Sequence, residues 1–156
     1  MGNLRLIEKF YASFAALDAE GMASCYHKEI EFEDPAFGVL KGERAANMWR
    51  MLCASQKEKE QVFKVVFSDI TAHSVHWEAF YTFSKTGRKV HNKIDASFEF
   101  KDGLILRHTD VFNLRQWAKQ ALGFKGALLG GTSFFQKKLQ AQTNRLLDKF
   151  EAKSKQ

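Results

Sequence analysis

The sequence predicts an α+β domain: a cone-shaped roll in which N-terminal helices pack on a strongly curved, mostly antiparallel sheet, with an extra C-terminal helix. Three observations predict this class. Apolar residues near the start of the chain recur at helical spacing, four later runs are rich in aromatic and β-branched residues, and short turns rather than helices join those runs. Because helices and strands do not alternate, a parallel sheet built from βαβ units is not expected.

The length of 156 residues fits one domain with a C-terminal extension. We divide the chain into a domain of residues 1–122, a glycine-rich connector of residues 123–132 and a basic amphipathic helix of residues 133–156. The 15 phenylalanines are an unusually large number for this length. So much ring area requires a large curved core or a cavity that the rings line.

The first third of the chain is expected to contain three helices and one strand. Apolar residues at helical spacing predict an amphipathic first helix: Leu4, Ile7, Tyr11, Phe14 and Leu17. A short helix around residues 22–27 follows. Apolar and acidic residues alternate over residues 30–34, as in a half-buried strand, up to the only proline, Pro35. After a loop between Gly38 and Gly42, residues 43–53 return to helix.

The rest of the chain predicts an antiparallel meander followed by helices. Strands are expected over residues 62–70, 75–84, 89–100 and 104–112, joined by hairpin turns at residues 85–87 and 101–103. Residues 114–122 and 133–152 are helical in pattern, and the connector between them should be a flexible joint. The last helix is expected to dock on the domain or on a partner subunit and to cover the pocket or a sheet edge. Its apolar stripe should be buried there: Phe135, Leu139, Leu146 and Phe150.

Side-chain phase along the strands places three polar groups on apolar rows. Asp34 is in phase with Ile30 and Phe32, and His108 and Asp110 are in phase with the leucines of the last strand. An acid on an apolar face is costly unless it is paired or functional. We therefore expect Asp34 and Asp110 on opposite sides of one pocket, with Asp34 as general base and Asp110 as orienting acid or alternative base. His108 or Tyr81 would donate a hydrogen bond.

The wall of this pocket is expected to be aromatic. Apolar walls with a few convergent polar groups are typical of a site for a small apolar molecule. The residues expected to contact it are Tyr11, Phe14, Trp49, Trp77, Tyr81, Asn92 and Phe112.

Structural interpretations of the same polar residues remain open. An aspartate before proline is often a turn or cap residue, which applies to Asp34. A single histidine on an apolar row, such as His108, is more often a satisfied core residue than a catalyst. Two acids and one histidine on the inner faces of separate strands are harder to explain in this way, because each needs its own partner.

The net charge of +6 is concentrated near the C-terminal end, since residues 133–156 contain six basic and two acidic side chains. A basic tail on a nearly neutral body favours a solvated helix face over a phosphate-binding surface, so no nucleic-acid partner is expected. No run is long and apolar enough for a membrane span. The two cysteines lack zinc spacing, and residues 126–132 lack the lysine of a phosphate loop. These features predict a cytoplasmic protein without metal or other cofactor.

Two stretches carry a family resemblance. Glu33-Asp34-Pro35 looks like the strand end where ketosteroid isomerases hold their aspartate base. Residues 98–117, with Asp110 near their end, are similar to the closing hairpin of limonene epoxide hydrolases, in which the matching acid is catalytic. Over residues 4–122 the chain thus resembles SnoaL-like and ketosteroid isomerase-like proteins of the nuclear transport factor 2-like superfamily. The resemblance implies a cone-shaped fold and a homodimer.

The same resemblance shows departures at functional positions. The isomerase tyrosine falls at Ser13 and its protonated aspartic acid at Ala96, so the oxyanion hole of that reaction is missing. The arginine and partner acid of the epoxide hydrolase fall at Trp77 and Ala79. We therefore expect an SnoaL-like protein that performs neither of these two reactions.

Three classes of function follow. An enzyme would use Asp34 or Asp110 in acid/base catalysis of isomerase, cyclase or hydratase type on a small apolar ligand. A binding module would hold such a ligand without turnover, and an interaction protein would fill the cone with its own side chains. The homodimer is expected to form through the outer face of the meander, where apolar and small polar groups mix: His76, Phe80, Thr82, His91, Ser97, Ile105, Thr109 and Val111.

Overall fold

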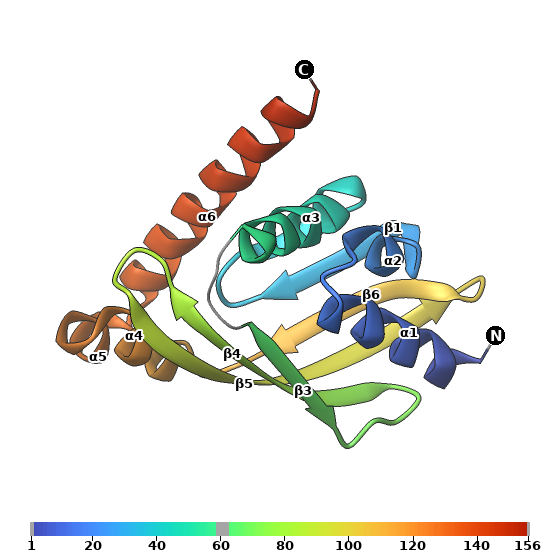
Figure 1. The fold of residues 1–156 in the computed structure, drawn as a ribbon, viewed down its shortest axis with the longest axis horizontal. Coiled ribbons are helices and arrows are strands. Elements are labelled where there is room, and N and C mark those ends of the chain that lie inside the picture. The colour runs from blue at the N-terminus through green and yellow to red at the C-terminus, as the bar shows by residue number, and fades with distance from the viewer. Residues whose placement is uncertain (1, 59–62, 156) are drawn as a thin grey trace.

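The computed structural model describes residues 2–58 and 63–155 and confirms the α+β class. Helices and strands follow one another in a single domain with a long last helix (Figure 1). In chain order the elements are α1 (Asn3–Ala15), α2 (Ala19–Ala23), β1 (Tyr26–Asp34), β2 (Gly38–Lys41), α3 (Glu43–Lys57), β3 (Lys64–Ser68), β4 (Ser74–Phe83), β5 (Arg88–Lys101), β6 (Leu104–Val111), α4 (Leu114–Leu122), α5 (Phe124–Leu129) and α6 (Ser133–Ser154).

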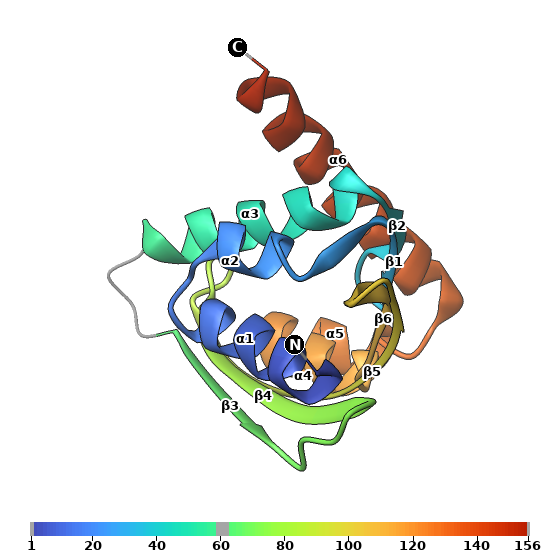
Figure 2. The ribbon, with the colours of Figure 1, turned by 90° about the vertical axis from the view of Figure 1, so that its right-hand side faces the viewer.

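One six-stranded sheet, in the order β2-β1-β6-β5-β4-β3, forms the frame of the domain. The last four strands make the predicted antiparallel meander, and β1 pairs with β6 in parallel. Figure 2 shows the sheet curving strongly around a central space, with α2 and α3 on the side opposite β3 and β4. Val62, from which the first meander strand is predicted to start, lies outside the described residues.

Two segments differ from the prediction because strand pairing replaces local structure. The helix expected around residues 22–27 ends at Ala23, since Tyr26 already pairs with Ile105 as the first residue of β1. The expected loop after Gly38 is the short strand β2, which forms a hairpin with β1. The pairing of Tyr26 has no local signal, because its partner strand lies about 80 residues further along the chain.

Strand β6 contains one residue more than the facing stretch of β5. Phe100 pairs with Ile105 and Glu99 pairs with Arg107, so Leu106 is the extra residue of a β-bulge. The bulge turns Ile105 into the core, where it is fully buried, and our placement of Ile105 on the outer face is wrong. His108 and Asp110 keep the predicted inward phase, and both are buried.

The glycine-rich connector contains a helix, α5, which packs against α4. A Cβ on Gly126 would lie 1.9 Å from the carbonyl oxygen of Ala118, so this glycine permits close helix packing. The expected flexible joint is therefore ordered by contact between two helices. Among the described residues no helix is both long and apolar enough to cross a membrane.

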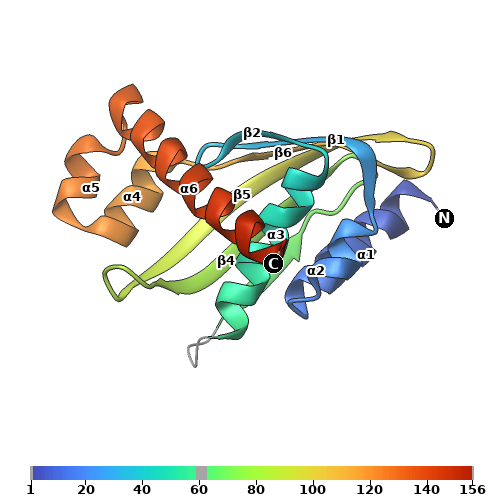
Figure 3. The ribbon, with the colours of Figure 1, turned by 90° about the horizontal axis from the view of Figure 1, so that it is seen from above.

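Helix α6 passes the turn between β1 and β2 and lies beside α3 (Figure 3), and its C-terminal end extends beyond the rest of the fold (Figure 1). Its fully buried residue is Leu147, whereas Leu146 of the predicted stripe is 46% exposed. Phe135, Leu139 and Phe150 are half-buried. The stripe is only partly buried because this face of α6 borders an open cavity, in line with the expectation that the helix covers the pocket.

Candidate functional site

A cavity of about 850 Å³ lies between the concave face of the sheet, α3 and α6. Its size is that of sites for drug-sized ligands, and its walls are mostly apolar. Aromatic rings from all three sides contribute to the walls, and two methionines line the side formed by α3. The polar groups set into these walls are the residues that could carry chemistry.

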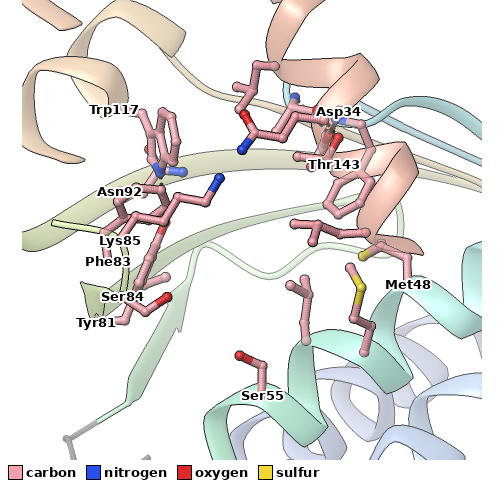
Figure 4. A pocket seen from close by; sticks show the side chains of 18 of the residues that line it. Asp34, Met48, Ser55, Tyr81, Phe83, Ser84, Lys85, Asn92, Trp117 and Thr143 are labelled. Carbon is pink, nitrogen blue, oxygen red and sulfur yellow. Dashed lines mark hydrogen bonds between the residues drawn. The ribbon is translucent and has the colours of Figure 1, made fainter. Parts of the chain in front are cut away.

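Most of the predicted site residues line this cavity. Figure 4 shows Asp34 on one side and Tyr81, Asn92 and Trp117 on the other. The lining includes both predicted acids and six of the seven predicted contact residues: Asp34, Asp110, Phe14, Trp49, Trp77, Tyr81, Asn92 and Phe112.

Tyr11 is the predicted contact residue that the structure places elsewhere. Its ring is buried among Phe67, Trp77 and Phe98. Its hydroxyl has no hydrogen-bond partner within the described part of the chain. Burial and the charge of Asp110 raise the pKa of Tyr11 well above its ordinary value. Tyr11 lies in the core because residue 11 falls in the middle of the buried face of α1.

Asp34 ends β1 and organises the turn into β2. Its Oδ1 accepts hydrogen bonds from the backbone N–H groups of Ala36 (2.9 Å) and Phe37 (2.6 Å). The pKa of Asp34 is nevertheless raised to about 7, chiefly because burial disfavours the charged form, and further by the charge of Asp110. The turn interpretation of this residue is therefore correct and leaves the second oxygen, Oδ2, available in the cavity wall.

Helix α6 holds the same turn from the opposite side. The turn carbonyls of Pro35, Ala36 and Phe37 accept hydrogen bonds from three α6 side chains: Gln140 Nε2 (3.2 Å), Thr143 Oγ1 (2.8 Å) and Asn144 Nδ2 (2.9 Å). The N–H groups of the turn are bound by Asp34 and the carbonyls by α6. This arrangement fixes the Asp34 carboxylate relative to the cavity.

Asp110 lies beside Asp34 rather than across the cavity from it. Strands β1 and β6 are adjacent, and their register pairs Phe32 with His108 and Glu33 with Thr109. The two acids therefore occupy neighbouring strands at the same end of the sheet and on the same face. The prediction that they lie on opposite sides is wrong, because it did not foresee the parallel pairing of β1 with β6.

A chain of buried hydrogen bonds runs behind Asp110. Trp49 Nε1 donates to Tyr26 Oη (2.8 Å), so the hydroxyl proton of Tyr26 is directed to His108 Nδ1 (2.7 Å). With Nδ1 as acceptor, the neutral ring of His108 carries its proton on Nε2, which donates to Asp110 Oδ1 (2.9 Å). Trp77 Nε1 also faces this oxygen at 3.4 Å. His108 is fully buried, so it acts on the cavity through Asp110.

Tyr81 and Asn92 supply polar groups on the β4–β5 wall. Tyr81 Oη accepts a hydrogen bond from Trp117 Nε1 (2.7 Å), which leaves the hydroxyl proton free to bind a ligand. Burial raises the pKa of Tyr81, so the hydroxyl stays protonated near neutral pH. The side-chain amide of Asn92 has no hydrogen-bond partner among the described residues. Both residues can donate a hydrogen bond to an oxygen in the cavity.

Sequence reasoning did not find Tyr26, Trp117 or the hydrogen bonds from α6 to the turn after Asp34. Tyr26 was expected on a short helix, and its position opposite His108 depends on the pairing of β1 with β6. Trp117 belongs to the predicted helix of residues 114–122, whose apolar face was a usable signal. Gln142 lies in line with the apolar stripe of α6 and interrupts it. A polar residue at this place was another sign that this face of the helix borders a cavity.

Two further features limit the chemistry of the chain. Asp95, next to the position of the isomerase's second acid, points to the outer face, where its Oδ1 is 2.8 Å from His76 Nδ1. Within residues 2–58 and 63–155, no group of three or more histidine, cysteine, aspartate or glutamate side chains is arranged to hold a metal ion. The candidate site therefore consists of Asp34, the Asp110–His108 pair and the donors Tyr81 and Asn92.

Comparison with solved structures shows the same fold in several proteins. A candidate polyketide cyclase from Silicibacter sp. TM1040 shares 22% identity over 77% of this chain and 95% of its own, with a TM-score of 0.61. An epoxide hydrolase of Mycobacterium tuberculosis, similar to limonene epoxide hydrolases, shares 20% identity over 82% and 90%, with a TM-score of 0.57. A nuclear transport factor 2-like protein of unknown function from Burkholderia pseudomallei shares 15% identity over 78% and 99%, with a TM-score of 0.60.

These identities show a common fold and do not transfer an activity. No curated protein is similar enough in sequence to match the chain. The model of the SnoaL-like domain family matches residues 7–108, which run from α1 through most of β6 and include Asp34 and His108. The chain therefore belongs to the SnoaL-like domain family.

Proposed function

We propose that this protein is an acid/base enzyme in which Asp34 removes a proton from a small, largely apolar molecule bound in the cavity. The observation that carries the proposal is the state of Asp34: a carboxylate with one uncommitted oxygen, set in an apolar wall, with its pKa raised to about 7. A general base works best when its pKa lies near the working pH. A carboxylate in ordinary solution, with a pKa about three units lower, is a much weaker base.

The neighbouring groups support distinct roles in such a reaction. Removal of a proton from carbon or oxygen next to a carbonyl leaves negative charge on oxygen. Tyr81 and Asn92 lie on the wall facing Asp34 and can donate hydrogen bonds to that oxygen (Figure 4). His108 holds Asp110 in place, and Asp110 raises the pKa of Asp34 through its charge. Asp110 is the alternative base.

The names of structural neighbours support a reaction of cyclase or isomerase type. One neighbour is named as a candidate polyketide cyclase and another as an epoxide hydrolase. Epoxide hydrolysis of the limonene type is disfavoured here, because Trp77 and Ala79 stand at the positions assigned to the hydrolase's arginine and second acid. Ketosteroid isomerisation is disfavoured because Ala96 replaces the protonated acid. Acid/base chemistry on a different carbonyl compound fits the groups that are present.

The base can be tested with 5-nitrobenzisoxazole, an apolar carbon acid. Removal of its ring proton breaks the N–O bond and releases a coloured cyanophenolate, so the assay needs only a base in an apolar cavity. We expect the protein to accelerate this elimination, with a rate that rises with pH and has a midpoint near 7, because only ionised Asp34 accepts the proton. Asp34→Asn should lower the rate by at least about 100-fold.

The matched control is Asp95→Asn, which removes an acid from the outer face and should leave the rate unchanged. Loss of the rate in Asp110→Asn but not in Asp34→Asn would assign the base to Asp110 and contradict the proposal. A cavity that binds an apolar fluorescent probe but gives no acceleration would favour the second candidate function, a binding module without turnover. The apolar cavity by itself supports a binding module as well as it supports an enzyme.

A further inference from the structure

The opening of the cavity carries a group of lysines, which we call the mouth lysines: Lys85, Lys125, Lys138, Lys149 and Lys153. All five line the cavity and are also exposed, so their ammonium groups stand where the cavity meets solvent. They come from three separate elements, namely the β4–β5 turn, α5 and α6. Figure 4 shows the Lys85 side chain extending into the cavity toward the side of Asp34.

The mouth lysines are not neutralised by the surrounding protein. None of them forms an ion pair with another described residue. The acids of α6 do not serve this purpose, because Asp148 and Glu151 both bind Arg44 on the side that faces α3. In the described part of the lining the only acids are Asp34 and Asp110, which lie in the sheet wall. The charge of the cavity is thus divided, with acids inside and lysines at the mouth.

Apolar side chains of α5 and α6 alternate with these lysines. Phe134, Leu129 and Leu146 are exposed at 70%, 49% and 46% and line the same opening. The Lys138 Nζ atom lies 6.0 Å from the centroid of the Phe134 ring. An opening that combines exposed rings with unpaired cations fits a ligand that is apolar and negatively charged.

We infer that the molecule bound in the cavity is an amphipathic anion, whose acidic group is held by the mouth lysines while its apolar body fills the cavity. This inference rests on the proposed function and specifies its substrate class. The division of charge also sets the orientation of the ligand. Asp34 and Asp110 repel an anionic group from the inner wall, and the lysines attract it at the opening, so the apolar end enters first and meets Asp34.

The test compares two fluorescent probes that differ in one group. 1-Anilinonaphthalene-8-sulfonate is an apolar ring system with an acidic group, and N-phenyl-1-naphthylamine is the same ring system without it. Titration of each probe at about 50 mM salt should show that the sulfonate binds at least about tenfold more tightly, and screening by about 500 mM salt should remove most of this preference.

Variants of α6 locate the preference at the mouth. The double change Lys138→Gln and Lys149→Gln should lower the sulfonate affinity by at least about threefold and leave the amine affinity unchanged. The matched control is Lys137→Gln and Lys155→Gln, which removes the same charge from the same helix but from residues outside the cavity lining. The control should retain both the preference and the elimination rate of 5-nitrobenzisoxazole.

Each remaining outcome has a defined meaning. Equal loss in both double variants would show attraction to α6 as a whole and would overturn the inference. Competition of the sulfonate by vesicles of phosphatidylglycerol, but not by the soluble anion dodecanoate, would assign the lysines to a lipid surface and also overturn it. Equal affinity for both probes would overturn the substrate class alone. If neither probe bound, the result would contradict the proposed function as well as the substrate class.

Discussion

At the scale of single residues, Asp34 joins a structural role to a chemical one. Its Oδ1 binds two N–H groups of the turn, which lowers its pKa, while burial and Asp110 raise it. Burial is the largest of these influences, and the result is a pKa of about 7. The hydrogen bonds hold the carboxylate in place, and the apolar wall makes it basic.

The raised pKa of Asp34 makes stability depend on pH. An aspartate that titrates near 7 when folded and near 4 when unfolded binds more protons in the folded state, so the free energy of unfolding falls as pH rises from about 4 to about 7. Asparagine can still accept the turn hydrogen bonds through its amide oxygen. We expect Asp34→Asn to raise the free energy of unfolding by about 1–2 kcal/mol at pH 8, with little change at pH 4.

Urea unfolding of both proteins at the two pH values measures this difference. A stabilisation of the same size at pH 4 and pH 8 would show that the effect does not come from the charge of Asp34. The comparison is independent of any ligand, so it examines the electrostatic basis of the proposed chemistry separately from turnover.

The inward phase of Asp34, His108 and Asp110 could be predicted because strand alternation is a local property. Their hydrogen-bonding partners could not be predicted in this way. The bond from Tyr26 to His108 joins residues 82 positions apart and depends on which strand lies beside β6. The proximity of Asp34 to Asp110 has the same origin. The alternation of side chains along a strand shows which face of the sheet a residue occupies. Only the order of the strands shows which residues lie beside it.

At the scale of elements, α6 is the helix whose role differs most from its sequence pattern. One side binds the turn that follows Asp34, and a second side faces the cavity. Arg44 of α3 fastens the helix: it binds Asp148 (2.9 Å), Glu151 and the side chain of Asn144 (2.9 Å). Basic composition alone suggested a solvated helix, because composition does not show which lysines border a cavity.

Arg44→Ala should loosen α6 and with it the turn that positions Asp34. The lost ion pairs and hydrogen bonds are partly buried, so we expect the free energy of unfolding to fall by about 1–2 kcal/mol. Lys41→Ala removes a comparable but more exposed ion pair, with Glu31, and should cost less than about 0.5 kcal/mol. Thermal and urea unfolding of the two variants measure the difference. Equal effects would mean that Arg44 does not anchor α6.

At the scale of the whole molecule, the fold class and the meander were predictable because periodicity and hairpin turns are local. The turn at Asp102 and Gly103 shows this: both residues have positive φ, 53° and 76°, as a two-residue hairpin requires. The parallel pairing of β1 with β6 joins distant segments and has no local signal. That pairing closes the cone and creates the cavity.

We propose that the protein forms a homodimer through the outer face of β4, β5 and β6. This face carries a connected polar group in which His76 binds Asp95 (2.8 Å) and Glu78 (2.7 Å), and Glu78 binds His91 (2.5 Å). Phe80 stacks on His91 at 4.1 Å and remains half-exposed. Exposed aromatic rings are enriched at protein interfaces, and the charges beside Phe80 are already paired within the chain.

Light scattering at micromolar concentration should give about twice the 17.9 kDa mass of the chain. Phe80→Glu places a charge in the proposed interface and should shift the mass to that of one chain. Leu128→Glu changes a 62% exposed residue of α5, away from this face, and should leave the mass unchanged. A wild-type mass of one chain would refute the dimer.

The extra residue Leu106 has a consequence for comparing this chain with its relatives. Counted from the hairpin turn, Asp110 stands one position further along than an unbroken strand would place it, and Leu106 absorbs the difference. A relative that lacks this insertion would carry its matching acid one position earlier, so an alignment without a gap would set Thr109 against that acid. Deleting Leu106 would leave Ile105, His108 and Asp110 on the concave face, because Arg107 and Thr109 would then alternate with them in an unbroken strand. The extra residue thus joins two stretches of opposite sequence phase so that both point the same way into the cone.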